Sequence, residues 1–226
     1  MVKLVAFFKR TPGMTVEAFQ EHWRGTHAEL VVRQGGLRRY VQNHTLASAY
    51  ARPGSEPFCD GVAEAWFDDT QAMRDLAPSA EYAAVRADEV NFIDAASMGV
   101  VLTDEVTIVD GRVPNDAAKL IAFLTKRPDV SVEHFQGHWR EKHGPIAARI
   151  PGLRRYVQCH ARRGIYESGR TPAFDGIPMS WFDDLGAVRA SGRSREFEAT
   201  RADEPNFMAS GRLPFVVATE HEVGIG

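Results

Sequence analysis

The chain lacks the residues and patterns that mark several large protein classes. Only two residues are cysteines, Cys59 and Cys159, and they show no metal-type spacing, so we expect neither a disulfide framework nor a zinc site. No apolar run approaches the ~20 residues of a membrane span. The net charge of -3 provides no basic surface for nucleic acid or an anionic membrane. A strand-like pattern begins at Met1, which predicts no signal peptide, and two thiols without a disulfide framework predict a reducing, cytoplasmic location.

Catalytic signatures are missing as well. The chain has no glycine-rich phosphate loop, no Gly-x-Ser-x-Gly motif and no setting for a cysteine nucleophile, which argues against nucleotide-dependent dehydrogenases and acyl-serine hydrolases. His22 and His27 lie five residues apart, which is about 140° around a regular helix at ~100° per residue. They therefore cannot chelate one metal from such a helix, and no second cluster supplies ligands. We expect no metal and no cofactor.

The main feature that is present is a repeat. Residues 3–44 match residues 119–160 at 22 of 42 positions. A 226-residue chain with such a duplication is expected to form two domains, 1–110 and 117–226, joined by a linker at 111–116.

Hydrophobic periodicity predicts the same elements in both copies. In the first copy Val16, Phe19, Trp23, His27 and Leu30 follow helical spacing. In the second copy Pro145 disfavours helix at Gly144, so we expect that helix to break or kink at His143. The expected strands lie at 3–10, 37–45, 62–67 and 98–107, and again at 120–125, 153–160, 177–182 and 213–221. A second helix follows the third strand of each copy and is interrupted near Pro78 and Gly192.

This order, β-α-β-β-α-β, is the split βαβ unit of an α+β ferredoxin-like fold. Residues 3–10 are apolar on both strand faces, so both faces of the sheet should be covered. The helices cover one face, and the other repeat is the obvious cover for the second. We therefore predict two antiparallel sheets packed face to face as an intramolecular dimeric α/β-barrel with an interior cavity.

Several motifs recur in both copies in a fixed order. They are Phe-x-x-His-Trp-x-x-x-His, Arg-Tyr, Asp-Gly, Trp-Phe-Asp-Asp and Arg-Ala-Asp-Glu-x-Asn-Phe. Their order and spacing resemble the EthD family of the dimeric α/β-barrel superfamily, and the resemblance covers essentially the whole chain twice. It implies a fused duplication of a domain that usually pairs as a homodimer. His143-Gly144-Pro145 keeps the family pattern, whereas His27-Ala28-Glu29 departs from it.

The resemblance implies several activities. The founding member is linked to degradation of a fuel ether, and relatives are associated with oxidoreductase annotation, pigment dehydration and polyketide tailoring. The wider superfamily holds cofactor-free monooxygenases, isomerases and haem proteins, so fold alone does not settle function. Uptake of hemin by the purified protein would test the haem alternative.

Candidate site residues come from the polar groups on apolar faces. His27 and His143 can move protons near pH 7, or they can be buried histidines that bond to backbone. Glu64, whose equivalent is Met179, can act as a base if burial raises its pKa, or it can face water. The candidate pocket-lining residues are Tyr40, His44, Tyr156, His160, Glu64, Trp66 and Trp181, for which the alternative is a solvated edge, interface hydrogen bonds or ordinary core.

Two functions remain open. One is an enzyme that binds a small hydrophobic molecule, aromatic, polyketide-like or ether-derived, and uses histidine for cofactor-free oxidation, isomerisation or dehydration. The other is a non-catalytic binding or stress-associated module with structural histidines. A single chain that closes its own barrel, or a homodimer of that chain through outer surfaces, fits both.

Overall fold

The computed structural model describes residues 1–51 and 54–225. The predicted loop at 47–60 therefore falls partly on residues 52–53, which lie outside the described residues. The chain divides into two compact units. Unit 1 contains Met1–Leu102 and the residues from Glu220 onward, and unit 2 contains Thr103–Thr219. None of the helices among the described residues is long and apolar enough to cross a membrane.

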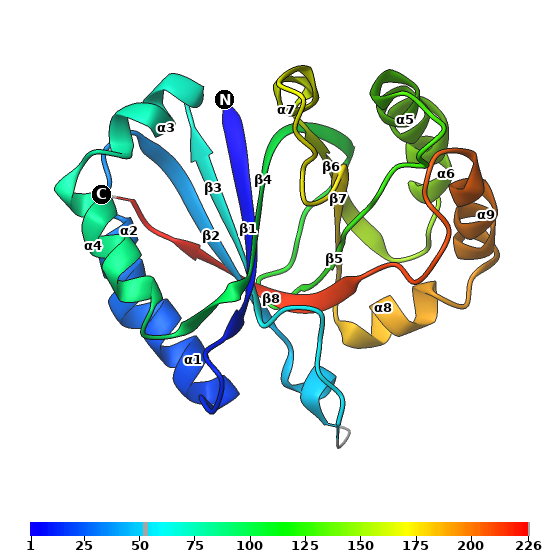
Figure 1. The fold of residues 1–226 in the computed structure, drawn as a ribbon. Coiled ribbons are helices and arrows are strands. Elements are labelled where there is room, and N and C mark those ends of the chain that lie inside the picture. Colours follow the sequence, from blue (N-terminus) through cyan, green and yellow to red (C-terminus); the bar gives the residue numbers. More distant parts are fainter. Residues whose placement is uncertain (52–53, 226) are drawn as a thin grey trace. The chain divides into compact units, whose positions relative to one another are not determined.

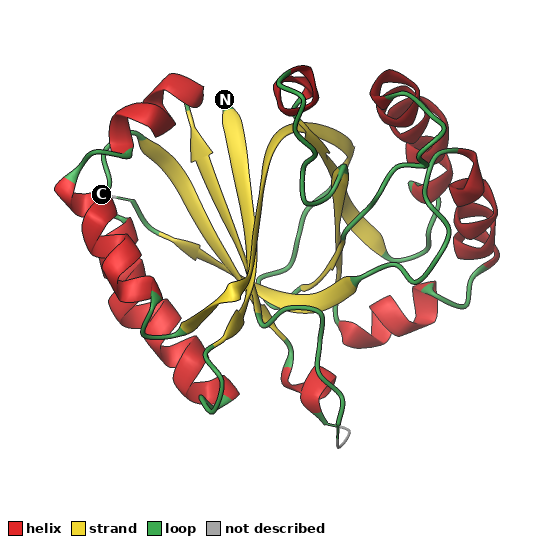
Figure 2. Cartoon of the chain, in the orientation of Figure 1, coloured by secondary structure: helices red, strands yellow, loops and turns green. Residues whose placement is uncertain are grey.

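In unit 1 the helices lie along one side of the strands (Figures 1 and 2). The strands are β1 (Val2–Arg10), β2 (Leu37–Thr45), β3 (Gly61–Phe67) and the first part of β4 (Ile93–Asp110). The helical segments are α1 (Val16–His22), η1 (Trp23–His27), α2 (Ala28–Val31), η2 (Ala47–Tyr50), α3 (Thr70–Leu76) and α4 (Ala80–Glu89).

Unit 2 repeats this arrangement. Its strands are β5 (Ala118–Ala122), β6 (Leu153–Ala161), β7 (Gly176–Phe182) and the first part of β8 (Phe215–Val223). Its helical segments are α5 (Val132–His138), η3 (Trp139–His143), α6 (Gly144–Ala147), α7 (Arg163–Glu167), α8 (Leu185–Ser191), α9 (Arg195–Asp203) and η4 (Glu204–Asn206).

The strands pair in the order β1-β3-β2-β8-β5-β7-β6-β4, which closes a barrel. The α+β fold of two ferredoxin-like repeats in one antiparallel barrel is thereby confirmed. The last strand of each repeat runs from one compact unit into the other. β4 continues from Thr103 into unit 2, where it pairs with β6, and β8 starts in unit 2 beside β5 and ends in unit 1. The predicted boundaries at 110 and 117 follow the sequence repeat, whereas the compact units exchange these strand ends.

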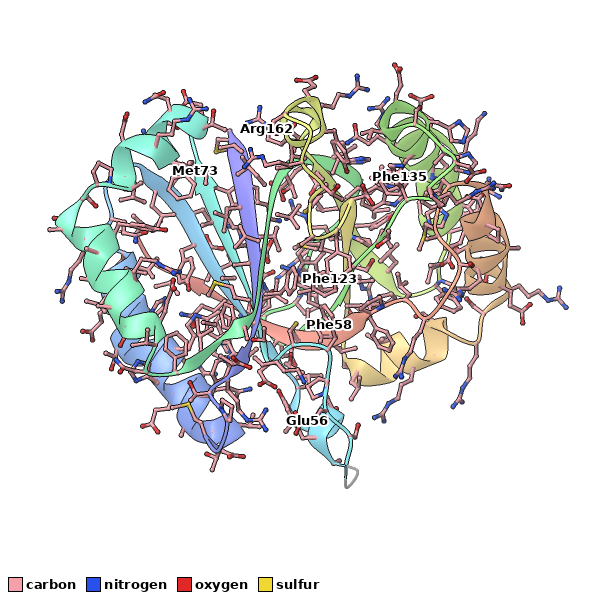
Figure 3. The ribbon with its side chains drawn as sticks, in the orientation of Figure 1. Glu56, Phe58, Met73, Phe123, Phe135 and Arg162 are labelled. Carbon is pink, nitrogen blue, oxygen red and sulfur yellow. The ribbon has the colours of Figure 1, made fainter. Side chains whose placement is uncertain are left out.

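The local signals that start the helices act as expected. Thr15 accepts a hydrogen bond from the backbone N–H of Ala18, and Ser131 caps α5 in the same way. The aromatic stripe of each first helix then packs on its sheet. Phe19 and Trp23 are fully buried in unit 1. Phe135, labelled in Figure 3, contacts Trp139 and Phe207 in unit 2.

Three local features differ from the sequence expectation. β4 is an 18-residue strand that starts at Ile93, before the predicted residue 98. The loop after β6 contains helix α7. The helix does not break at His143, because Gly144 keeps helical backbone angles and α6 continues with Pro145 in its first turn. A proline is tolerated there, since the N–H it lacks would not bond within the new helical turn.

Candidate functional site

A π-helical turn stands at the centre of the first helix in each unit. It spans Trp23–His27 in unit 1 and Trp139–His143 in unit 2. A π turn closes hydrogen bonds between residues five apart, so it brings His22 and His27 toward the same side of the helix. The argument from 100° per residue assumed a regular helix, and it was wrong about this convergence. Single π turns are frequent at functional sites.

In unit 1 the two histidines meet one carboxylate. Nδ1 of His27 lies 2.9 Å from Oδ2 of Asp88, and Nε2 of His22 lies 2.9 Å from Oδ1. Nδ2 of Asn91 donates to Oδ1 at 3.3 Å. The ring of Phe92 packs against both imidazoles, at 4.9 Å from His22 and 4.8 Å from His27. Helix α1 and its π turn are thus joined to helix α4 through Asp88.

Unit 2 builds the same cluster. Nδ1 of His143 lies 3.0 Å from Oδ2 of Asp203, and Nε2 of His138 lies 3.0 Å from Oδ1. Asn206 donates to Oδ1 at 2.9 Å, and Phe207 covers both imidazole rings. We call each set a His–Asp cluster: residues 22, 27, 88, 91 and 92 in unit 1, and residues 138, 143, 203, 206 and 207 in unit 2.

The electrostatics fix the protonation of His27 and His143, which are the more buried histidines of the two clusters and are called the inner histidines. Burial lowers the pKa of His27 and of His143, and the hydrogen bond to the aspartate opposes this only in part. Burial acts to raise the pKa of Asp88, but the bonds from His27, Asn91 and His22 outweigh it, and the pKa is lowered. The pKa of Asp203 is lowered in the same way. At neutral pH the aspartate is therefore ionised and the inner imidazole is neutral.

The tautomer follows from this charge state. An ionised carboxylate only accepts hydrogen bonds, so the proton of the neutral His27 ring must lie on Nδ1. Nε2 then carries the lone pair, and the same holds for His143. A histidine in this state can accept a proton at Nε2 while the aspartate stabilises the imidazolium that forms.

A second polar network lies beneath the same helix. In unit 1 the indole Nε1 of Trp23 donates to the hydroxyl of Tyr40 at 3.0 Å, and Nε2 of Gln42 donates to the carbonyl of Trp23 at 2.7 Å. His44 stacks on Trp23 with ring centroids 4.5 Å apart, and its Nε2 lies 3.0 Å from Oε1 of Gln42. Trp139, Tyr156, Gln158 and His160 repeat these contacts in unit 2.

One atom of this network is without a partner in both units. Because the Gln42 amide nitrogen bonds to a carbonyl, its oxygen must accept from Nε2–H of His44. Nδ1 of His44 therefore holds a bare lone pair and is buried, and neither it nor Nδ1 of His160 has a hydrogen-bond partner within residues 1–51 and 54–225. Burial, with Arg24 and His221 nearby, lowers the pKa of His44 to about 3, and burial and Arg140 lower that of His160 to about 4. Both rings are hydrogen-bond acceptors at neutral pH.

Close packing explains the glycine that begins the third strand of each repeat. A Cβ on Gly61 would come within 2.5 Å of the Trp23 ring, and a Cβ on Gly176 would come within 2.4 Å of the Trp139 ring. The Asp-Gly motif therefore makes room for the indole that holds the network together.

The predicted pocket residues separate onto two faces of the sheet. Tyr40, His44, Tyr156 and His160 contact the helix layer, as described above. Glu64 and Trp66 point to the opposite face, where Glu64 pairs with Lys3 and the Lys3 ammonium lies 4.6 Å from the Trp66 ring centroid. Trp181 has the matching contact with Lys119 at 4.4 Å. That these residues line a ligand cavity stays a prediction.

The sequence interpretation missed the acidic half of the His–Asp cluster. Asp88 and Asp203 lie in Arg-Ala-Asp-Glu-x-Asn-Phe, which recurs in both copies together with the histidines of the first helix. That joint recurrence was the available signal. The described residues contain no group of three or more His, Cys, Asp or Glu side chains placed to hold a metal ion.

Unit 2 has a pocket of about 610 Å³ next to its cluster. Arg127, Arg201 and the loop at 208–211 contribute to its lining. Glu204 and Met208 also line it, and they directly follow Asp203 and Phe207 of the cluster in sequence.

Comparison with known proteins gives a consistent result. The EthD domain model matches residues 11–96 and 127–211. Among solved structures, an anthrone oxidase-like protein has a TM-score of 0.65 at 13% identity, over 99% of this chain and 93% of its own. A mutant chlorite dismutase from Candidatus Nitrospira defluvii has a TM-score of 0.52 at 11% identity, over 96% and 90%. An ethyl tert-butyl ether d (ethd) family protein from Bacillus halodurans c-125 is 24% identical over 45% of this chain and 95% of its own, with a TM-score of 0.36. No curated protein matches the sequence.

Proposed function

Since this chain belongs to the EthD family, we propose that it is an enzyme for a small hydrophobic molecule, with His143 and His27 as general bases or acids. The observation that carries this proposal is the hydrogen bond from Nδ1 of each histidine to a buried aspartate, at 3.0 and 2.9 Å. An oriented, neutral imidazole next to a carboxylate is a recurrent arrangement for proton transfer.

The ligand is an aromatic, polyketide-like or ether-derived compound that carries a hydroxyl group. The bare Nδ1 atoms of His44 and His160 support the hydroxyl, because each is a buried acceptor in the layer that also holds the histidine of the His–Asp cluster. Aromatic side chains, among them Trp23, Phe19 and Phe92, support the apolar body. In this arrangement Tyr40 and Tyr156 hold the indoles in place, and burial keeps their hydroxyls neutral by raising each pKa to about 12.

The chemistry is a cofactor-free oxidation, isomerisation or dehydration that starts with removal of a proton. In the oxidation, Nε2 of the histidine takes a proton from an activated carbon such as the methylene of an anthrone. Dioxygen then accepts the electrons. One of its oxygen atoms becomes the new carbonyl oxygen, and the other leaves as water with the two hydrogens of the methylene.

The test replaces the bases one at a time. Anthrone, whose enol tautomer carries the hydroxyl group, is the first probe, because an anthrone oxidase-like protein shares the fold. His143→Ala, His27→Ala and the double variant are compared with wild type by anthrone loss and dioxygen uptake. Losing a general base costs roughly 10²–10⁴-fold in rate, so the variant of the working copy should fall by that factor. His134→Ala is the control, because His134 is an exposed histidine on the same helix as the cluster.

Two further measurements make the result specific. Asp203→Asn and Asp88→Asn should lower the rate of anthrone oxidation and shift the acidic limb of its pH–rate profile, since the carboxylate fixes the tautomer of the histidine. If oxidation of anthrone persists at full rate in the double histidine variant, the assignment is wrong.

The second candidate function is a non-catalytic binding module in which the histidines are structural. Its supporting observation is that Asp88 accepts from three side chains and joins α1 to α4. In that case the histidine variants lose thermal stability while ligand binding is unchanged. Solution mass separates a single chain from a homodimer of the fused chain under either function.

A further inference from the structure

The face of the unit 1 sheet opposite its helices carries a buried ion pair. Nζ of Lys3 lies 2.5 Å from Oε2 of Glu64, and the two side chains are 2% and 1% exposed. The Lys3 ammonium also lies over the ring of Trp66. Strand alternation places these side chains away from Tyr40 and His44, which contact the helix. The pair is therefore separate from the His–Asp cluster.

Asn43 extends this pair with an unpartnered acceptor. Its Nδ2 donates to the carbonyl of Val62 at 2.9 Å and to Oε1 of Glu64 at 2.7 Å. Flipping the amide would set its oxygen against two acceptors, so these contacts fix its orientation. Oδ1 is then buried, with no hydrogen-bond partner among the described residues, and the side chain is fully inaccessible to solvent.

The surroundings of this acceptor are apolar. Val5 and Val41 lie directly across from Glu64 on the neighbouring strands, and Val62 lies across from Asn43. All three valines are fully buried. An unpaired polar atom in such surroundings is costly, because neither water nor protein replaces its lost hydration.

Unit 2 shows that the fold does not need Asn43 and Glu64, although it keeps a buried lysine, Lys119, at the position of Lys3. There Cys159 replaces Asn43 and Met179 replaces Glu64, and their sulfur atoms lie 4.0 Å apart. Both side chains are fully buried. Packing alone therefore does not require the two residues that unit 1 has and unit 2 lacks, Asn43 and Glu64.

We propose that Asn43, held by Glu64 and Lys3, forms a binding site in unit 1 for a small neutral phenol or enol. The ligand hydroxyl donates to Oδ1 of Asn43, because a bare amide oxygen selects a hydrogen-bond donor. The ligand is uncharged, because a charged group would lose its hydration among these fully buried side chains. Its body is apolar, because valine side chains surround the acceptor. The inference goes beyond the proposed function and does not depend on the histidines.

A matched pair of ligands tests the site. 4-Fluorophenol offers the hydroxyl donor, and 4-fluoroanisole has a methyl group in place of that hydrogen. Binding is followed by ¹⁹F NMR, and the side-chain amide signals of Asn43 are followed by ¹⁵N NMR. We expect the phenol to bind about tenfold more tightly than the ether, as the loss of one hydrogen bond to a buried acceptor implies. The Asn43 amide signals should shift as the phenol saturates.

Variants from the other copy supply the control. Asn43→Cys introduces the residue of unit 2 and should weaken phenol binding about tenfold, whereas Cys159→Ser in unit 2 should leave it unchanged. The double variant His27→Ala, His143→Ala should also keep it, so failure of the proposed catalysis does not affect this test. If Asn43→Cys does not fold, the comparison of the two ligands on wild type still decides.

Two results overturn the proposal. One is equal binding of phenol and ether. The other is an Asn43 amide signal that does not respond at saturation, which means that Oδ1 is satisfied by a bound water only.

Discussion

The two units are nearly identical on the helix side of their sheets and differ on the opposite side. The His–Asp cluster recurs with the same hydrogen bonds. The distance from histidine Nδ1 to aspartate Oδ2 is 2.9 Å in unit 1 and 3.0 Å in unit 2. On the opposite side the repeat positions of Asn43 and Glu64 are taken in unit 2 by the apolar sulfur residues Cys159 and Met179. The conserved half of this comparison shows what each helix layer needs, and the divergent half shows where the fold tolerates change.

The divergent side implies the largest effect on stability. Glu64→Met gives unit 1 the residue of unit 2 and removes the carboxylate that lies 2.5 Å from Lys3. Removing one partner of a buried pair costs about 3–5 kcal/mol. Adding Lys3→Met should recover most of that loss, since an apolar pair carries no buried charge. The measurement is the urea midpoint of unfolding for both variants.

Met179→Leu is the control for this comparison, because a volume-conserving change of this kind costs less than about 1.5 kcal/mol. A Glu64→Met midpoint no lower than that of the control would show that the ion pair contributes nothing to the difference between the units.

The next effect concerns the histidines beneath the helix, and it appears as a pH dependence. The unfolded pKa of histidine is about 6.5, whereas the folded pKa is about 3 for His44 and about 4 for His160. Below about pH 6.5 the unfolded chain binds more protons than the folded chain. The free energy of unfolding therefore decreases as the pH is lowered, by up to about 1.4 kcal/mol per pH unit for each histidine. The loss continues until the pH reaches the folded values.

His44→Gln and His160→Gln isolate these two contributions. Glutamine can keep the N–H that reaches Gln42 or Gln158 and does not titrate. Each variant should flatten the fall in urea midpoint between pH 6 and pH 4 relative to wild type, and His44→Gln should continue to do so below pH 4. His27 and His143 add to the same acid loss in all variants, because their pKa values are also lowered. An unchanged slope in both variants would show that the two rings are protonated in the folded protein.

Most of the fold could be predicted from the sequence, because the same local hydrophobic patterns occur in both repeats. The stripe of Phe19 and Trp23 predicted the buried face of the first helix, and both residues are fully buried. Two-residue alternation placed Tyr40 and His44 together on one strand face. Alternation cannot say which face the helices cover, so the polar network under Trp23 could not be assigned to the helix side.

The site was harder to predict for two physical reasons. A π turn has no periodic signature, since it inserts one extra residue into an otherwise regular 3.6-residue pattern. His22 and His27 therefore seemed to diverge. Their shared partner Asp88 lies 61 residues beyond His27, and only the fold brings the two together. The histidines alone suggested proton transfer, but the aspartate that orients them came from the structure.

The smallest expected effect tests one difference within the first helix, where Gly144 in unit 2 replaces Ala28 in unit 1. A Cβ on Gly144 would lie 3.1 Å from Nε2 of Gln158 and 3.1 Å from Cδ1 of Ile108. It would also lie 3.3 Å from the backbone oxygen of Trp139, to which Nε2 of Gln158 donates at 2.9 Å, so each of these neighbours must shift by a few tenths of an ångström. The strain should offset the gain of up to about 1 kcal/mol that alanine has over glycine in a helix.

Gly144→Ala should therefore change the urea midpoint little, whereas Ala28→Gly, its mirror change, should destabilise by at least about 1 kcal/mol, because it loses helix propensity and a buried methyl group. A loss well above 1 kcal/mol for Gly144→Ala, with a shift in the side-chain amide signals of Gln158, would mean that the glycine is needed for the close approach of helix and strand. The two helix layers would then differ in spacing, and His160 would sit in a tighter network than His44.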